Sequence, residues 1–127
     1  MYRGRNGQTG LKRWPRAVAG ALNFRRVSAG YWHTCGEATT DRAYCWGSNS
    51  FGALGDGSPE GTDQLKPVAV AGGLFFRQLS AGTSLSCGKT SAGLGYCWGE
   101  NWHGDLGDGI GGYGVVSLTP VPVAGPL

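Results

Sequence analysis

The feature that most constrains the fold is a repeat of 52 residues. Without a gap, residues 15–57 align with residues 67–109, and 23 of these 43 positions are identical. The shared pattern includes "YCWGSN" at 44–49 and "YCWGEN" at 96–101. A third copy begins where "PVPVAGPL" (120–127) repeats "PVAVAGGL" (67–74). A chain that contains the same sequence unit twice is expected to fold as a repeat protein, in which each unit buries its apolar face against the next.

Each unit predicts four short β-strands. In the second unit we expect them around 68–71, 76–81, 85–89 and 95–98, separated by Gly72-Gly73, Gly82 and Ala92-Gly93. The chain has 25 glycines and 11% aromatic residues, which is typical of short strands joined by tight turns rather than of disorder. The prediction is an all-β chain of two four-stranded antiparallel blades, an incomplete β-propeller. We divide it into a basic segment at 1–14 that is a possible remnant of a preceding repeat, blade 1 (15–66), blade 2 (67–119) and the start of a third repeat (120–127).

The two units also carry a family resemblance. The stretches "HTCGEATTDRAYCWGSNSFGALGDG" (33–57) and "LSCGKTSAGLGYCWGENWHGDLGDG" (85–109) resemble the repeat of the regulator of chromosome condensation family, RCC1, and most of residues 15–127 is covered. The resemblance implies a propeller of about seven blades. It also implies roles found in that family, namely nucleotide exchange on small GTPases, chromatin binding and secreted inhibition. Leu85-Ser86 replaces the His33-Thr34 pair in the second unit, so a role for this histidine in every blade is not expected.

Positions that recur in both units are interpreted as scaffold. The predicted repeat core is Trp46, Leu54, Trp98 and Leu106, with each tryptophan placed to wedge against the next blade. Asn49 and Asn101 are expected to bond the backbone of their own turns.

The four cysteines form a C-x9-C pair in each unit. If the hairpins turn at Thr40 and Ala92, Cys35 lies opposite Cys45, and Cys87 lies opposite Cys97, within reach of a bridge. Two disulfides are therefore favoured over four free thiols. A zinc site is disfavoured because the sequence has no C-x2-C motif. Bridges would place the parent protein in an oxidising, extracytoplasmic compartment, although the N-terminus lacks the apolar segment of a signal peptide.

Function is expected from binding rather than catalysis. No catalytic motif and no cofactor or metal site is found in the sequence, so we expect a non-catalytic protein-interaction scaffold, a fragment of a larger propeller. The alternative is an exchange-factor-like or chromatin-binding regulator. Candidate binding residues are the aromatic and histidine side chains at variable positions: Tyr31, Trp32, His33, Phe51, Trp102, His103 and Tyr113. Phe51 and Trp102 are equally well explained as filling gaps between blades.

Charge and hydropathy limit the classes of partner that the sequence favours. Residues 1–30 carry seven basic side chains and no acidic one, whereas residues 31–127 have a net charge of −4. A solvated basic terminus is favoured over nucleic-acid binding because no reader motif accompanies it. No apolar run approaches the length of a membrane span. The expected partner is a protein of unknown identity, with a small GTPase as the alternative. Since two blades cannot close a ring, self-association to complete a propeller is also considered.

Overall fold

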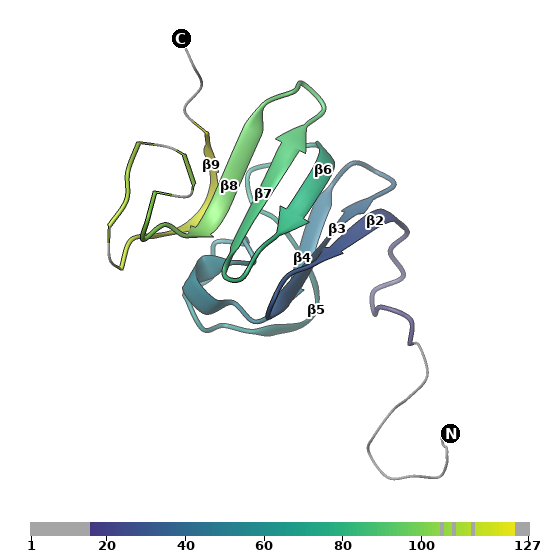
Figure 1. Ribbon diagram of the computed structural model, residues 1–127. Coiled ribbons are helices and arrows are strands. Elements are labelled where there is room, and N and C mark those ends of the chain that lie inside the picture. The colour runs from purple at the N-terminus through teal and green to yellow at the C-terminus, as the bar shows by residue number, and fades with distance from the viewer. Residues whose placement is uncertain (1–15, 105, 108, 113, 124–127) are drawn as a thin grey trace, which may run out of the picture.

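The computed structural model describes residues 16–104, 106–107, 109–112 and 114–123, which form two four-stranded antiparallel sheets (Figure 1). The first sheet contains β2 (Phe24–Ala29), β3 (His33–Ala38), β4 (Ala43–Gly47) and β5 (Gln64–Ala69). The second contains β6 (Phe76–Ala81), β7 (Leu85–Thr90), β8 (Gly95–Glu100) and β9 (Val116–Pro122). A short 3-10 turn, η1 (Ser50–Gly52), follows β4. The prediction of an all-β chain of two four-stranded blades is confirmed.

The repeat is reproduced in the strand register. β2 and β6 each carry an irregularity after their first residue, between Phe24 and Arg26 and between Phe76 and Gln78. Such a bulge bends the strand and places Phe76 and Leu79 on the same side. There both side chains flank Gly88, where an added Cβ would lie 2.6 Å from the ring of Phe76. Glycine at this position therefore allows the ring to pack directly on the neighbouring strand.

One predicted strand belongs to a different sheet from the one expected. The strand near residues 68–71 was assigned to the second unit, but β5 pairs with β4 through Cys45 and Val68 and so closes the first sheet. β9 closes the second sheet in the same way, with Cys97 opposite Val121. The assignment was wrong because periodicity identifies a strand without identifying its partner. The unit boundaries drawn from the sequence stay predictions.

The core lies between the two sheets. Both sheets and the loop after η1 contribute to one cluster of buried side chains: Cys35, Ala43, Cys45, Leu54, Phe76 and Trp98. Trp98 comes from the second sheet and packs against the first. It therefore contacts the preceding blade, and the prediction that it contacts the next blade was wrong. Side chains of both sheets therefore share one core.

Across the described ranges, no helix combines the length and the apolar character that crossing a membrane requires.

Candidate functional site

Each hairpin is closed by a disulfide. Cys35 bonds Cys45 and Cys87 bonds Cys97, and each pair occupies directly opposed positions on neighbouring strands. The predicted pairing is confirmed, and the alternatives of free thiols and a zinc site on these cysteines are wrong. Among the described residues no group of three or more His, Cys, Asp and Glu is arranged to hold a metal ion.

A buried hydrogen-bond network joins the two sheets. The hydroxyl of Ser86 on β7 donates to the carbonyl oxygen of Ala53 at 2.9 Å, and the indole Nε1–H of Trp98 donates to the same oxygen at 2.9 Å. His33 on β3 lies 2.8 Å from the Ser86 oxygen through its Nε2. The first sheet thus supplies the imidazole and the carbonyl, and the second supplies the hydroxyl and the indole.

The network fixes the protonation of His33. Because Ser86 donates its single hydroxyl hydrogen to the carbonyl of Ala53, its oxygen accepts a hydrogen bond from Nε2–H of His33, and the neutral ring then carries no hydrogen on Nδ1. Burial lowers the pKa of His33, which keeps the ring neutral. Nδ1 is buried and has no hydrogen-bond partner among the described residues.

The His33–Ser86 pair superficially resembles a nucleophile beside its base. However, His33 and Ser86 are only 3% and 1% exposed. The hydroxyl proton is directed at a backbone carbonyl instead of at the imidazole. A serine in a catalytic pair donates to the histidine and needs space for a substrate beside it. The geometry therefore fits a structural hydrogen bond that joins the two blades.

Gly55 makes room for the tryptophan of this network. Its φ is +68°, a left-handed conformation that favours glycine. A Cβ at this position would lie 2.5 Å from Nε1 of Trp98. The repeated "GDG" stretch is thus explained in part by the approach of an indole from the next blade.

The loops after β4 and β8 are organised by a buried asparagine. In the first, the Asn49 side chain accepts from the backbone N–H of Leu54 at 3.1 Å and donates to the carbonyl of Pro59 at 3.1 Å. In the second, the Asn101 side chain accepts from Leu106 N–H at 3.1 Å. Leu54 and Leu106 are fully buried as a result. Both asparagines act on their own turns, as the sequence suggested.

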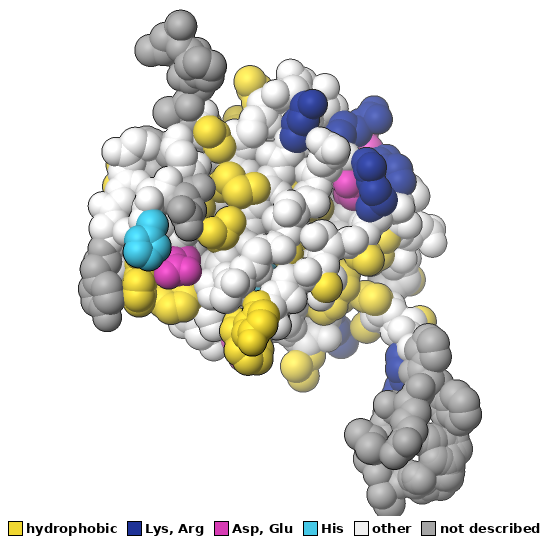
Figure 2. All heavy atoms as spheres, viewed as in Figure 1, with side chains coloured by type: hydrophobic (Ala, Val, Ile, Leu, Met, Phe, Trp, Pro, Cys, Tyr) yellow, Lys and Arg dark blue, Asp and Glu magenta, His cyan; other side chains and the backbone are white. Residues whose placement is uncertain are grey.

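A cluster of charged side chains spans the opposite end of the sheets. Glu37, which is 2% exposed, accepts from Arg25 at 3.1 Å and from Arg26 at 3.2 Å. Asp41 lies 2.8 Å from Arg25 and 3.6 Å from Arg77 of the second sheet. Hydrogen bonds to Asp41 and then to Glu37 raise the pKa of Arg25. Figure 2 shows basic (dark blue) and acidic (magenta) side chains gathered at the upper right, on the side where Figure 1 labels β2 and β6. The arginines hold the buried carboxylate and link the two sheets.

Tyr31 and Trp32 form an exposed aromatic pair between β2 and β3. Their rings meet edge to face at 4.6 Å between centroids, and the residues are 70% and 61% exposed. Backbone hydrogen bonds hold the turn, from Tyr31 N to Gly82 O of the second sheet and from Ser48 N to Trp32 O. Yellow side chains are visible at the lower centre of Figure 2, where β2 ends. This pair is rigidly supported yet almost uncovered.

The other candidate binding residues have different surroundings. Phe51 and Trp102 pack edge to face at 5.3 Å between ring centroids, so the loop of the first sheet contacts the loop of the second. His103 is exposed beside Trp102. His33 is in the buried network, apart from the exposed pair. Tyr113 lies outside the described residues. Among the described candidates only His33 is buried, and the binding role of the others stays a prediction.

Several residues of these networks were not assigned a role from the sequence, among them Ala53, Ser86 and Glu37. Ala53 acts through its carbonyl oxygen, which no side-chain pattern reveals. Ser86 occupies the position of Thr34 in the repeat, so the preserved hydroxyl was a usable signal. Glu37 becomes Lys89 in the second unit, and that reversal of charge was a further signal.

Comparison with known proteins agrees with this architecture. Two family models, both described as the regulator of chromosome condensation (RCC1) repeat, match residues 24–53 and 40–88. The probable E3 ubiquitin-protein ligase HERC4 of Rattus norvegicus is 33% identical over 88 residues, which cover 68% of this chain and 8% of that protein. The human probable E3 ubiquitin-protein ligase HERC3 is 36% identical over 84 residues, 65% of this chain and 8% of that protein.

Solved structures show the same fold at low identity. Prp20p of Saccharomyces cerevisiae, in a study of its binding to Gsp1p and histones, matches with a TM-score of 0.73 and 18% identity, over 86% of this chain and 27% of that chain. Human WBSCR16 matches with a TM-score of 0.73 and 16% identity, over 88% and 28%. The chain thus spans about a tenth of the curated relatives and about a quarter of these structures. With its strand order, its interlocked blades and both repeat matches, the chain belongs to the RCC1 repeat family.

Proposed function

We propose that the chain is a non-catalytic scaffold that binds a protein partner through the loop end that carries Tyr31 and Trp32. The observation that supports this most is the exposed aromatic pair, fixed by backbone hydrogen bonds to both sheets. Large aromatic side chains held in place before binding lose little entropy on contact and are frequent anchors of interfaces. The second unit has Thr83 and Ser84 at these positions, so the pair is not part of the repeated scaffold.

The assignments of the other aromatic and histidine residues support the same reading. Phe51 and Trp102 are occupied with each other, and His33 is occupied with Ser86. Phe51 and Trp102 are half-buried and His33 is buried, whereas Tyr31 and Trp32 are exposed, so among the described aromatic candidates this pair is the most accessible to a partner. The two disulfides further support an oxidising compartment for the parent protein, and hence an extracytoplasmic partner.

The test is a quantitative comparison of captured proteins. We would immobilise the chain, a Tyr31→Ser, Trp32→Ser variant and a Thr83→Ala control, and measure bound proteins from extracellular fluid and from cell extract by mass spectrometry. The proposal expects partners that the control retains and the aromatic variant loses by at least tenfold, a difference of about 1.4 kcal/mol. Identical protein sets on all three would contradict it.

The exchange-factor alternative has its own measurement. Prp20p was studied with Gsp1p, so Gsp1p loaded with fluorescent GDP is the natural probe. We expect the rate of GDP release to be unchanged when the chain is added. Acceleration that depends on the concentration of the chain would establish the alternative in place of the scaffold.

A further inference from the structure

The charged side chains are divided between the two ends of the sheets. Because the strands of each sheet run antiparallel, the connections β2–β3, β4–β5, β6–β7 and β8–β9 lie together at the loop end, which carries Tyr31 and Trp32. No lysine or arginine occurs in the sequence of these four connections, residues 30–32, 48–63, 82–84 and 101–115. Among the described residues, the acidic side chains at this end are Asp56, Glu60, Asp63 and Glu100. The loop end is therefore acidic.

The opposite end of the sheets is basic. Its turns and strand ends carry five basic and two acidic side chains: Arg25, Arg26, Arg42, Arg77 and Lys89, with Glu37 and Asp41. Both acids are already bound by arginines. Dark-blue side chains gather at this end in Figure 2. The two ends thus favour partners of opposite charge.

Backbone hydrogen bonds place acidic residues beside the aromatic pair. Ser48 N–H donates to the carbonyl of Trp32 at 3.0 Å, and the next backbone N–H, that of Asn49, donates to the carboxylate of Asp63 at 2.8 Å. Asp63 is exposed, so its carboxylate can accept from a ligand as well.

The second sheet contributes an acidic residue in the same way. Glu100 N–H donates to the carbonyl of Ser84 at 2.9 Å, in the turn whose Gly82 carbonyl accepts from Tyr31 N–H. Acidic residues of both sheets therefore border the pair.

The exposed rings suit a planar cation. The Tyr31 and Trp32 rings are inclined at 86° to each other, and the face of an aromatic ring attracts a guanidinium group through its negative π density. The protein already contains one such contact, because the guanidinium carbon of Arg42 lies 4.4 Å from the centroid of the Phe75 ring. Arginine fits better than lysine, since a planar guanidinium can stack on a ring and still donate to a carboxylate.

We propose that the loop end binds an arginine-rich segment of the protein partner, with a guanidinium stacked on Trp32 or Tyr31 and donating to the carboxylate of Asp63. This inference rests on the proposed function, because it names the chemistry of the segment that the aromatic pair receives. Nucleic acids and anionic membrane surfaces are disfavoured, since acidic side chains repel phosphate groups. The residues concerned lie at the ends of strands and not on a sheet face.

The experiment is fluorescence anisotropy with labelled peptides and the full 127-residue chain. The probes are three short peptides of equal length that alternate glycine with arginine, with lysine or with glutamate. We expect the arginine peptide to bind, the lysine peptide to bind several-fold more weakly and the glutamate peptide not to bind. Affinity for the arginine peptide should fall as salt rises from about 50 to about 300 mM, because salt screens the carboxylates.

Variants of the chain test the two parts of the site. The Tyr31→Ser, Trp32→Ser variant should lose at least tenfold in affinity for the arginine peptide, and Trp32→Leu, which keeps apolar area without a ring face, should lose several-fold. Asp63→Asn should also lose several-fold at about 50 mM salt, while its amide oxygen still accepts from Asn49 N–H and preserves the loop. Circular dichroism verifies that each variant is folded.

Ser91→Lys is the matched control for charge. It changes the net charge by the same amount as Asp63→Asn, but at an exposed turn of the basic end, and it should leave the affinity unchanged. Equal losses in these two variants would assign binding to net charge and overturn the inference. An arginine peptide that does not bind, or that the Tyr31→Ser, Trp32→Ser variant still binds, would overturn it too.

The capture experiment separates this inference from the proposed function. Captured proteins that do not depend on Tyr31 and Trp32 would contradict the proposed function. Captured proteins that depend on this pair, but are retained by Asp63→Asn and at about 300 mM salt, would keep the scaffold and reject an arginine-rich segment as its ligand.

Discussion

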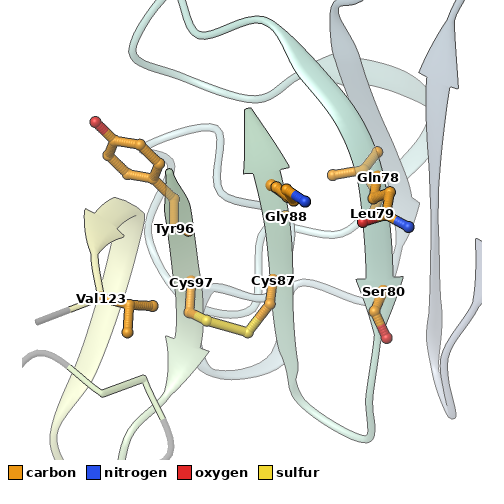
Figure 3. A pocket seen from close by; sticks show the side chains of 10 residues that line it. Gln78, Leu79, Ser80, Cys87, Gly88, Tyr96, Cys97 and Val123 are labelled. Carbon is orange, nitrogen blue, oxygen red and sulfur yellow. A yellow bond between two sulfur atoms is a disulfide. The ribbon is translucent and has the colours of Figure 1, made fainter. Parts of the chain in front are cut away.

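The two disulfide hairpins have nearly the same sequence and different surroundings. Cys35–Cys45 lies beneath the second sheet, in contact with Ser86 at 3.7 Å, and is almost wholly buried. Cys87–Cys97 lines a cavity on the second sheet (Figure 3), with Cys87 half-buried and Cys97 5% exposed. Since the strands, register and bonds are equivalent, the difference comes from the neighbour alone. In this fold, burial of a residue depends on whether a neighbouring blade covers it, and the sequence of its own repeat is not sufficient to predict that burial.

The two tryptophans provide the strongest test of that conclusion. Trp98 is fully buried between the sheets and donates to Ala53, whereas Trp46 is only partly buried. We expect Trp98→Ala to lower the free energy of unfolding by about 3–5 kcal/mol and Trp46→Ala by about 1 kcal/mol. Urea denaturation followed by far-UV circular dichroism, in dilute protein, measures both values.

Phe24→Ala is the control for loss of the aromatic contact within the first sheet. It should resemble Trp46→Ala, because it removes the aromatic ring that packs on Trp46. Equal losses for Trp98→Ala and Trp46→Ala would mean that each blade is stabilised internally, and the contrast drawn above would fail.

The two disulfides should differ in their rate of reduction, and we expect this effect to be smaller than the difference between the two tryptophan variants. A thiolate must reach the bond along its axis, so access controls the rate. In dilute protein we expect limiting dithiothreitol to reduce Cys87–Cys97 on the order of tenfold faster than Cys35–Cys45. Trapping the free thiols with an alkylating mass tag and mapping the peptides gives the two rates.

The same reaction in guanidinium chloride is the reference, because the unfolded chain exposes both bonds equally. Reduction of both disulfides at one rate in the folded chain would show that Cys87–Cys97 is as shielded as Cys35–Cys45.

The sequence predicted what lies within a blade better than what lies between blades. Mirror symmetry about Thr40 and Ala92 placed each cysteine opposite its partner, because hairpin register is set locally by the turn. The contact of His33 with Ser86 joins residues 53 positions apart and depends on how one sheet is placed on the next. The pairing of Phe51 with Trp102 is likewise a contact between loops of different blades. Neither distance is encoded in a single repeat.

The exposed pair was also visible in the sequence, although for an indirect reason. Tyr31 and Trp32 stood out because the two units differ at those positions. The same criterion selected His33, which proved to be buried. A position that differs between the repeats does not have the same structural role in both. Such a position can be an exposed binding residue or part of a contact between blades that occurs only once, and the sequence does not distinguish the two.

The smallest expected effect is a dependence of stability on pH through His33. Burial holds its folded-state pKa below the value of about 6.5 that it has in the unfolded chain. The unfolded chain therefore binds more protons in this range, and stability rises with pH. The contribution is fully present above about pH 6.5 and is lost as the pH falls toward the lowered folded-state pKa. Urea midpoints at successive pH values should fall accordingly.

His33→Gln separates titration from the hydrogen bond, since its amide still donates to Ser86 without binding a proton. This variant should lose the slope between pH about 7.5 and 5.5. A slope that survives in His33→Gln would assign the pH dependence to other groups.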